Sequence, residues 1–553
     1  MININKILIK SISIVAAVAL GTAVGWPVMS TPIPLDRDAD FSAYRMADHI
    51  RIIAAEERSV FHPEQRLIIR DYIIDVMNGF GLEAEIDDFE STITDYADRE
   101  VTLEGSNVLF RQYGRSDTAI MLMAHYDSRG VNWTLDPETE VHSLGAADSG
   151  YGIAVMFEIA RYWSEREPEN SIYYFFTDLE EIGLLGAIHA VESMDFSNVS
   201  LILNLEARGI RGPVYMFETN VKDYNVVRFF KESTSHRLSY SVATALYRIM
   251  PNLTDLTPFL EQEFNGMNFA PINSLLYYHT ERDIYENISH TTMQQYIDMI
   301  AALVESFVTN SSFSDMEYFQ ADHAAVFFPL PFDLFVLYAD HTAVLISFVM
   351  LALVIALLAY LKLQGKLCLR KTLLWALYIV SGIVAATLLG IVTTLAIFIF
   401  NTDMPIHMIR LQGEKIVIWF GVAVMLVLLG LFHIRMGNRF NRREMVVGAM
   451  LLLAVINLLM SFFLVGATFM VLFPMAAAYV CHLPTEIDSL RRTPLFLTLL
   501  NMLVIFFLAV LFGPLMYSIA RAASISGLFI VFALSVLLTA SLLPVWRKVE
   551  LQK

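Results

Sequence analysis

The chain has 553 residues, a formal net charge of −18 and 56% hydrophobic residues, and its mean hydropathy is +0.53. A soluble protein of this length contains less apolar sequence, so the composition excludes an entirely soluble class. The acidic balance disfavours a nucleic-acid partner, because phosphate binding needs clustered Lys and Arg. The two cysteines, Cys368 and Cys481, lie outside residues 35–310. That segment therefore holds neither a disulfide nor a thiol nucleophile.

The chain begins with an apolar run over residues 11–29, which follows Lys6 and Lys10. Such a run predicts either a secretory signal peptide or an uncleaved anchor. No clear small-x-small cleavage site stands before the following domain, and the run approaches the length that spans a bilayer. We therefore expect residues 1–34 to be an N-terminal signal anchor.

Residues 35–310 mix charged and apolar residues as a globular domain does, and two kinds of pattern alternate along them. Helical spacing predicts helices over 42–57, 64–80, 150–164, 184–193 and 223–235. Strand-like runs cover 102–112, 118–124, 171–177, 199–205, 213–217 and 273–278. This alternation predicts a layered α/β domain with a mostly parallel central sheet, whose ligands bind beyond the carboxyl ends of the strands.

The remaining sequence predicts a linker followed by a membrane domain. Residues 311–340 include an aromatic-rich stretch with two prolines, which suits a linker or an interfacial segment. Residues 341–553 predict an α-helical membrane domain of about seven spans with a cytoplasmic C-terminus. We place these spans near 341–361, 372–400, 416–433, 445–463, 466–482, 495–515 and 525–545.

The charges of the loops predict the orientation of these spans in the lipid bilayer. Basic residues gather in alternate loops, at 362–371, 435–443 and 491–492, and again at 547–548 after the last span. By the positive-inside rule both termini are cytoplasmic and residues 35–310 lie on the other side. The spans contain almost no ionisable residues, which disfavours a transporter. We expect them to anchor the domain, shape an access route or associate with partners, including copies of this chain in a homo-oligomer.

Five side chains with metal-binding groups end apolar runs in the globular half: His125, Asp148, Glu181, Glu206 and His279. Two imidazoles and three carboxylates can hold a pair of divalent cations if one carboxylate bridges them. Asp148 is the candidate for the bridge, and Glu180 is left over as a general base. This set describes a hydrolase with two metal ions.

Several of these residues also have a structural interpretation. Asp127 lies two residues from His125 and projects to the same side, where it can orient the imidazole, although a lone His125 would be a satisfied core histidine. Asp148 precedes a helical run and could be its N-cap. Glu180 and Glu181 could be a solvated acidic pair, but at a buried strand end they repel each other unless a cation compensates.

Two further carboxylates have open alternatives. Glu206 could form a salt bridge with Arg208 or Arg211 instead of binding a metal ion. Asp283 could orient the imidazole four residues before it, or it could bind Arg282.

The order of these motifs resembles a known family. His-x-Asp, Gly-Ala-x-Asp, Glu-Glu, Asn-Leu-Glu-Ala and Tyr-His-Thr follow one another within residues 42–300 as in the co-catalytic zinc aminopeptidases, peptidase family M28. Glu-Ala-Arg-Gly, Met216–Thr219 and the trailing spans resemble its membrane branch. That branch includes the vacuolar membrane protease and the endoplasmic-reticulum metallopeptidase.

The resemblance implies a zinc-exopeptidase-type fold, two Zn²⁺ ions per chain, and removal of N-terminal residues from a peptide substrate. It implies that one zinc is bound by His125, Asp148 and Glu206. It implies that the other is bound by Asp148, Glu181 and His279.

The resemblance also assigns the two catalytic residues and a substrate side. Glu180 is implied as the general base, and Asp127 is implied to support a metal ligand. Asp255 and Asn268 are implied on the substrate side of the site.

Two positions depart from the pattern of the family. Glu206 stands where soluble members often carry Asp, which affects the spacing of the metal ions. Ser149 follows the bridging position, where Asp or Asn is common, which affects the orientation of Asp148.

Three other functions stay open from the sequence: a glutaminyl-cyclase-like enzyme with one zinc, a catalytically inactive membrane receptor or scaffold, and a transporter with an appended domain. The cysteine-free domain and the short loops favour a bacterial inner membrane with a periplasmic domain. The endoplasmic reticulum or the vacuole of a eukaryote is the alternative location.

Overall fold

The computed structural model describes residues 4–131, 134–250, 252–399 and 439–522. The chain divides into a globular unit, Met29–Pro329 with Phe335–Leu337, and a helical unit, Met1–Val28 with Leu330–Leu334 and Tyr338–Lys553. The globular unit therefore extends beyond the predicted range of 35–310 at both ends. Most of the expected linker belongs to it, because Phe313, Phe319 and Phe327 are buried in its core.

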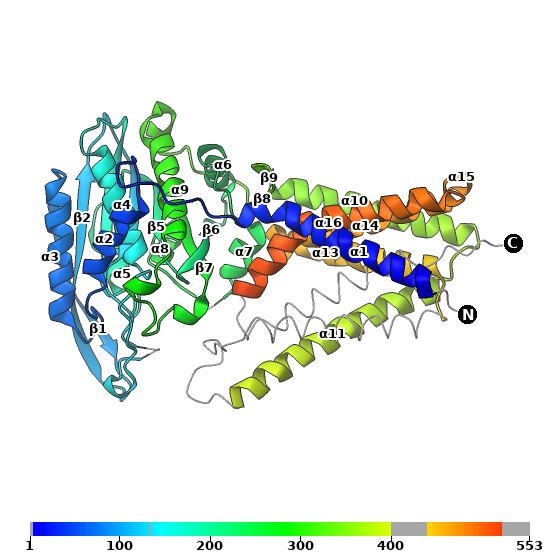
Figure 1. The fold of residues 1–553 in the computed structure, drawn as a ribbon, viewed down its shortest axis with the longest axis horizontal. Coiled ribbons are helices and arrows are strands. Elements are labelled where there is room, and N and C mark those ends of the chain that lie inside the picture. Colours follow the sequence, from blue (N-terminus) through cyan, green and yellow to red (C-terminus); the bar gives the residue numbers. More distant parts are fainter. Residues whose placement is uncertain (1–3, 132–133, 251, 400–438, 523–553) are drawn as a thin grey trace. The chain divides into compact units, whose positions relative to one another are not determined.

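A seven-stranded sheet forms the centre of the globular unit (Figure 1). Its strands are β1 (Ala84–Thr94), β2 (Glu100–Gln112), β3 (Ser116–His125), β4 (Asn170–Thr177), β5 (Val199–Leu205), β6 (Arg211–Thr219) and β7 (Gly266–Asn273). They lie in the order β1-β2-β4-β3-β5-β7-β6. The four central strands β4, β3, β5 and β7 are parallel. At the edges β2 pairs antiparallel with β4, β6 pairs antiparallel with β7, and β1 pairs antiparallel with β2. The predicted layered α/β domain with a mostly parallel central sheet is confirmed.

Helices cover both faces of this sheet. One face packs against α2 (Ala43–Ile53), α3 (Pro63–Gly79), α4 (Gly150–Trp163) and α9 (His290–Val308). The other face packs against α5 (Leu185–Ser193) and α8 (Leu256–Glu261). The helices α6 (Tyr224–Ser233) and α7 (Ser241–Tyr247) follow β6, and a small hairpin is formed by β8 (Ala325–Leu330) and β9 (Leu334–Ala339).

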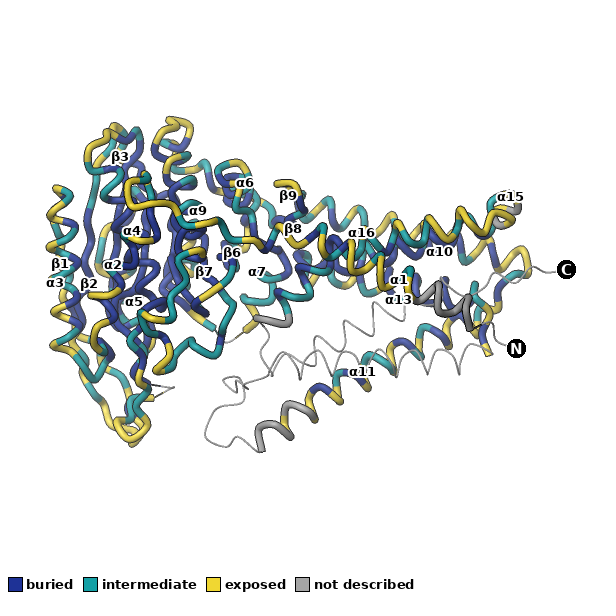
Figure 2. The backbone as a smooth tube through the Cα atoms, in the orientation of Figure 1, coloured by how far each residue is buried: buried dark blue, intermediate teal, exposed yellow. Residues whose placement is uncertain are grey.

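The alternation of side chains along β3 explains why its sequence is apolar throughout. Ile120 and Leu122 point into the core beneath α4, while Met121 and Met123 point into the core beneath α5 and α8. A strand covered on both faces needs apolar residues at every position, so it reads as a continuous run. Figure 2 shows these central strands buried along their length.

One predicted strand, 273–278, is wrong. The strand is β7, Gly266–Asn273, and Leu275–Tyr277 forms a short 3-10 turn after Ser274 adopts a left-handed conformation with φ of 65°. The Gly, Asn and Pro residues of β7 weaken its strand signal, whereas the apolar residues that follow mimic one. His279 is consequently held by a turn and not by a strand end.

The helical unit contains α1 (Ile4–Gly25), α10 (Asp340–Leu363), α11 (Leu369–Ile399), α13 (Arg442–Phe463), α14 (Thr468–His482), the short α15 (Asp488–Arg491) and α16 (Pro494–Ala522). Among the described residues, six helical segments are long and apolar enough to span a membrane. They correspond to the predicted spans at 11–29, 341–361, 372–400, 445–463, 466–482 and 495–515. The spans predicted at 416–433 and 525–545 lie outside the described residues.

Small and polar residues fit these helices together. A Cβ atom on Gly21 or Gly25 of α1 would lie 2.4 Å from the carbonyl oxygen of Phe506 or Val510 in α16, so glycine allows this close approach. In the same unit, the amide of Asn457 in α13 donates a hydrogen bond of 2.8 Å to the hydroxyl of a serine in α10.

Candidate metal centre

The five predicted ligands converge at the carboxyl edge of the parallel strands. His125 is the last residue of β3, Glu181 follows β4 and Glu206 follows β5, and parallel strands end at the same edge of a sheet. Asp148 lies just before α4, and His279 follows the 3-10 turn after β7. Segments that are far apart in the sequence therefore bring their side chains to one place.

The donor atoms form two groups that share one carboxylate. Nε2 of His125 lies 3.4 Å from Oδ1 of Asp148 and 3.6 Å from Oε2 of Glu206. Nε2 of His279 lies 3.1 Å from Oδ2 of Asp148 and 3.2 Å from Oε1 of Glu181. In each group the three donor atoms lie within 4.8 Å of one another. Each oxygen of Asp148 thus faces a different group, as a bridging carboxylate requires.

The chemistry of this donor set fits zinc. Zinc takes imidazole nitrogen and carboxylate oxygen ligands, and each group offers one imidazole and two carboxylates. Asp148, Glu181 and Glu206 are 4%, 6% and 7% exposed. Gathering three carboxylates in a buried site is costly unless a cation offsets their repulsion. Oε1 of Glu181 is also buried and accepts no hydrogen bond from the described residues, which leaves a lone pair for a metal ion.

The field of the site shifts the pKa of its histidine and carboxylates. Burial opposes the charged form of His125, but its hydrogen bonds to Asp127, Asp148 and Glu206 raise its pKa well above the usual value. Burial and the neighbouring carboxylates raise the pKa of Glu180 well above the usual value, although the charge of His125 opposes this shift. The carboxyl group of Glu180 therefore holds its proton more tightly than a free glutamate does.

Asp127 supports two parts of the site at once. Its Oδ1 lies 3.2 Å from Nδ1 of His125, so the imidazole can donate its proton there and keep Nε2 free for a metal ion. The same carboxylate accepts hydrogen bonds of 3.2 and 3.1 Å from the backbone N–H groups of Glu180 and Glu181. The residue before them, Leu179, has φ of 58°. A left-handed non-glycine residue costs about 1–3 kcal/mol, so these hydrogen bonds hold a strained turn.

Two residues support the ligands: Arg129, which the sequence did not point to, and Asp283, whose role differs from the two expected ones. Arg129 donates hydrogen bonds of 2.9 Å to Oε2 and to the backbone oxygen of Glu181. Asp283 accepts hydrogen bonds of 2.8 and 3.2 Å from the N–H groups of Ala147 and Asp148. The two roles proposed for Asp283 from the sequence, orienting His279 or binding Arg282, are replaced by this support of the bridging residue.

A buried arginine fixes the loop that carries the bridge. Arg58 is 0% exposed and donates to the backbone oxygens of Tyr126, at 2.6 Å, and Gly145, at 2.9 Å, as well as to that of Leu144. Burial lowers the pKa of Arg58 to about 10. It stays charged at neutral pH, and it ties the end of β3 to the turn before Asp148.

The structural alternatives for the ligands are not realised. Glu206 accepts a hydrogen bond of 3.1 Å from Asn204, and in the described part of the chain it forms no ion pair with Arg208 or Arg211. The N-cap of α4 is Ser149 and not Asp148, and neither side chain caps the helix.

Ser149 joins the bridging residue to the neighbouring strand. Its hydroxyl donates a hydrogen bond of 2.9 Å to the carbonyl oxygen of Leu205, the residue before Glu206. A Cβ atom on Gly152 would lie 2.4 Å from that same oxygen. Glycine at position 152 thus allows α4 to pack closely against β5. Although Ser149 departs from the pattern of the family, its side chain forms a defined hydrogen bond in this contact.

The two residues expected on the substrate side are fully buried. Asp255 accepts a hydrogen bond from Thr177, and burial raises its pKa to about 8. Asn268 donates hydrogen bonds of 3.0 Å to Glu218 and 2.7 Å to Thr254. Protein partners occupy the amide of Asn268, which suits support of the site, whereas Oδ1 of Asp255 is buried without a hydrogen-bond partner among the described residues.

Several known proteins are similar to this unit in sequence. The model of peptidase family M28 matches residues 107–304. The vacuolar membrane protease of Schizosaccharomyces japonicus is 26% identical over 298 residues, which cover 51% of this chain and 33% of that protein. The chain spans a third or less of the length of such relatives.

Solved structures that are similar to part of this chain include an aminopeptidase from Aneurinibacillus sp. strain AM-1 and the glutaminyl cyclase of Tannerella forsythia. The first is 14% identical, with a TM-score of 0.39, and covers 48% of this chain and 94% of its own. The second is 19% identical, with a TM-score of 0.39, and covers 48% and 98%. Over residues 107–304 the chain is therefore similar to peptidase family M28, and its described residues also include apolar helices of membrane-spanning length.

Proposed function

We propose that this protein is a membrane-anchored di-zinc aminopeptidase, which removes N-terminal residues from peptides on the non-cytoplasmic side. The observation that carries the proposal is the pair of donor groups that share Asp148, with His125 and Glu206 in one and Glu181 and His279 in the other. Two groups with a common carboxylate suit two ions held close together, whereas a cyclase-like site with one ion would need only one group.

Glu180 is the proposed general base. Its backbone is fixed by Asp127, and its side chain lies among the donors, close enough to His125, Glu181 and Glu206 for their charges to act on it. A carboxylate in this position can take a proton from the attacking water and return it to the leaving amine. When bound, zinc would supply polarisation of the scissile carbonyl and a lowered pKa for that water.

The other residues of the site keep the donors in place. Asp127 selects the tautomer of His125, Arg129 holds one oxygen of Glu181, and Asp283 holds the backbone at Asp148. Acidic side chains beside the metal ions would pair with the free α-amino group of a substrate. This is the support for an aminopeptidase over an endopeptidase.

The helices and the charges of their loops support the proposed location. Basic residues in alternate loops support cytoplasmic termini and a non-cytoplasmic catalytic domain. The absence of cysteine from residues 35–310 and the short loops support a bacterial inner membrane with the domain in the periplasm. Association of copies through the helices is a prediction of the same kind.

Replacing Glu180 by Gln tests the proposal, because the amide keeps the shape of the side chain but cannot accept the proton. We expect turnover of aminoacyl reporter substrates to fall by a factor of about 10²–10⁴, while the zinc content stays unchanged. Cyclisation of N-terminal glutamine peptides is the matched assay for the cyclase alternative. Unchanged turnover in Glu180→Gln, or wild-type protein active only in the cyclase assay, would reject the proposal.

A further inference from the structure

A second group of metal-binding side chains lies outside the centre, where Glu57, His62, Glu140 and His142 meet. Nδ1 of His142 lies 3.0 and 3.2 Å from the two oxygens of Glu57. His62 lies between the carboxylates, with Nε2 3.8 Å from Glu57 and Nδ1 3.8 Å from Glu140. Donor atoms of Glu57, Glu140 and His142 lie within 4.8 Å of one another.

This outer cluster has more negative charge than its own contacts compensate. In the part of the chain that the structure describes, neither Glu57 nor Glu140 pairs with Lys or Arg, and histidines are their ionic partners. Oε1 of Glu140 is buried without a hydrogen bond. The hydrogen bond to Glu57, with the nearby charges of Glu140 and Glu281, raises the pKa of His142. The cluster therefore attracts cations.

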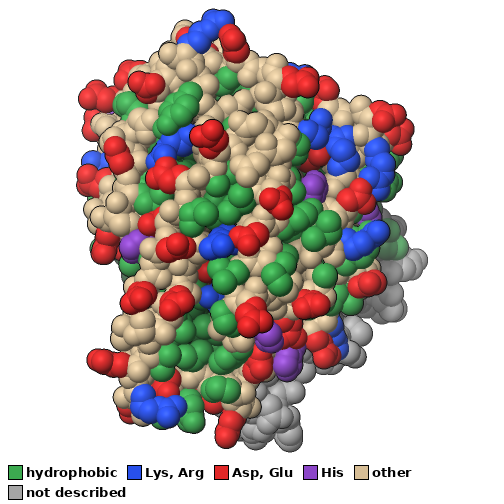
Figure 3. All heavy atoms as spheres, turned by 90° about the vertical axis from the view of Figure 1, so that its left-hand side faces the viewer, with side chains coloured by type: hydrophobic (Ala, Val, Ile, Leu, Met, Phe, Trp, Pro, Cys, Tyr) green, Lys and Arg blue, Asp and Glu red, His purple; other side chains and the backbone are tan. Residues whose placement is uncertain are grey.

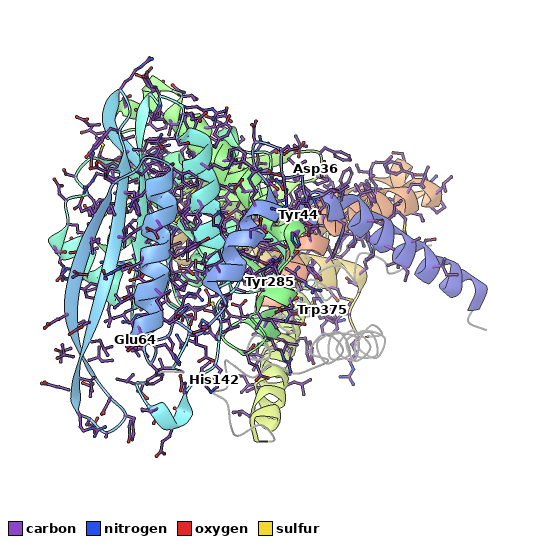
Figure 4. The ribbon with its side chains drawn as sticks, turned by 60° about the vertical axis from the view of Figure 1, so that its left-hand side comes forward. Asp36, Tyr44, Glu64, His142, Tyr285 and Trp375 are labelled. Carbon is purple, nitrogen blue, oxygen red and sulfur yellow. The ribbon has the colours of Figure 1, made fainter. Side chains whose placement is uncertain are left out.

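The cluster is open to solvent, as a site for an exchangeable ion must be. The side chains of Glu57 and Glu140 are 23% and 24% exposed, and that of His142 is 62% exposed. Figure 4 shows His142 at the same end of the globular unit as Glu64, in the first turn of α3. Figure 3 shows that acidic side chains are spread widely over one face of the molecule, so a negative surface alone does not distinguish this cluster. The imidazoles distinguish it, because they add nitrogen ligands to the carboxylates.

The cluster joins two segments of the chain that also meet beside the metal centre. Glu57 lies between α2 and α3, whereas Glu140 and His142 lie on the loop from β3 to α4 that carries Asp127 and Asp148. Beneath the cluster, the N–H of Ser128 donates a hydrogen bond of 3.1 Å to the carbonyl of the residue after Glu57. Within the loop, the N–H of Val141 donates a bond of 2.9 Å to Gly130.

We propose that Glu57, Glu140 and His142 form an additional zinc site, with His62 beside them, which fastens the β3–α4 loop to the α2–α3 connection. One imidazole and two carboxylates at mutual distances below 4.8 Å are a ligand set that zinc accepts, with a position left for water. The ion would also bind Oε1 of Glu140, which accepts no hydrogen bond from the described residues. The site acts on the outer side of the loop that holds the bridging residue, and the proposal does not depend on the activity of the centre.

Zinc content of the full-length protein in detergent tests this site. We expect His142→Ala and Glu140→Gln each to contain one zinc equivalent less than the wild type. His189→Ala is the matched control, because His189 forms a similar surface pair with Asp87 at 3.3 Å but belongs to no metal-binding group of the described residues. It should keep the wild-type content. If either His142→Ala or Glu140→Gln keeps the full content, the site is rejected.

Amide hydrogen exchange tests the fastening of the loop. Adding zinc to the metal-depleted protein should slow exchange in peptides that cover 129–143, and this protection should be lost in His142→Ala. Equal exchange in wild type and variant would overturn the fastening role. The difference of one equivalent does not depend on the zinc content of the centre, so this proposal and the proposed function can fail separately.

Discussion

The metal centre and the outer cluster contain the same kinds of donor atom but are built differently. At the centre, three ligands stand at the ends of parallel strands, and Asp127, Arg129, Asp283 and Arg58 fix their backbones or side chains. In the outer cluster the donors lie on loops and at the start of a helix, and their carboxylates are about a quarter exposed. Ligands on rigid elements are held in position before an ion binds. The centre suits catalysis, and the outer cluster suits a reversible structural ion.

The largest expected difference between the two regions is in turnover. Replacing His125 by Ala removes a ligand of the centre and should reduce turnover by at least about a thousandfold, as for loss of an essential group. Replacing His142 by Ala should leave turnover within about twofold, because no catalytic group contacts it. Steady-state assays of both variants under excess zinc check this. Comparable losses in the two variants would erase the distinction between the regions.

The next largest effect is on zinc affinity, when Asp127, which supports a ligand but binds no metal ion itself, is replaced. Asp127→Asn keeps the shape of the side chain but weakens its hold on His125 and on the backbone at Glu180. We expect zinc affinity to fall about 10–100-fold. Competition with a chelator measures this change, and Asp136→Asn, on the loop near the outer cluster, is the control. An affinity equal to that of the wild type would show that the centre is no better supported than the cluster.

The sequence predicts residues at strand ends better than residues on loops, and this explains which parts of the site could be foreseen. His125, Glu181 and Glu206 end apolar runs that become β3, β4 and β5, so alternation of elements was enough to place them at one edge. His279 was placed after a strand that does not exist, and its position depends on the turn after β7. Arg58, Arg129 and the outer cluster could not be predicted, because they depend on contacts between loops, which carry no periodic pattern.

The stability of the protein should also depend on pH through Glu218, a buried carboxyl group next to the metal centre. Burial raises the pKa of Glu218 to about 7 from 4.5, and Asn268 links it through Asn204 to Glu206. The folded state therefore keeps this proton to a higher pH than the unfolded chain, so stability falls as pH rises from 4.5 to 7.

Glu218→Gln has no proton to lose in this range. Relative to wild type it should gain at most about 3 kcal/mol of stability between pH 5 and pH 8. Thermal unfolding of the full-length protein at several pH values checks this. A wild-type stability that rises over this range, or an identical pH profile in the variant, would contradict the account of Glu218.

The smallest effect tests the contact that holds α4 against β5. Gly152→Ala would place a Cβ 2.4 Å from a carbonyl oxygen and should cost about 1–3 kcal/mol. Gly79→Ala, at the end of α3 with no atom within 4 Å of its Cβ, is the control and should be neutral or slightly stabilising. Unfolding midpoints of both variants give the comparison, and equal midpoints would show that α4 can move away from the strand.

The central claim is that one carboxylate serves two ions, and zinc counting tests it most directly. In a His142→Ala background, which removes the outer cluster, we predict two zinc ions per chain by native mass spectrometry. Adding Asp148→Ala to that background should remove both ions, because each group loses its shared ligand. A single ion before this substitution, or the loss of only one of two after it, would contradict the shared bridge.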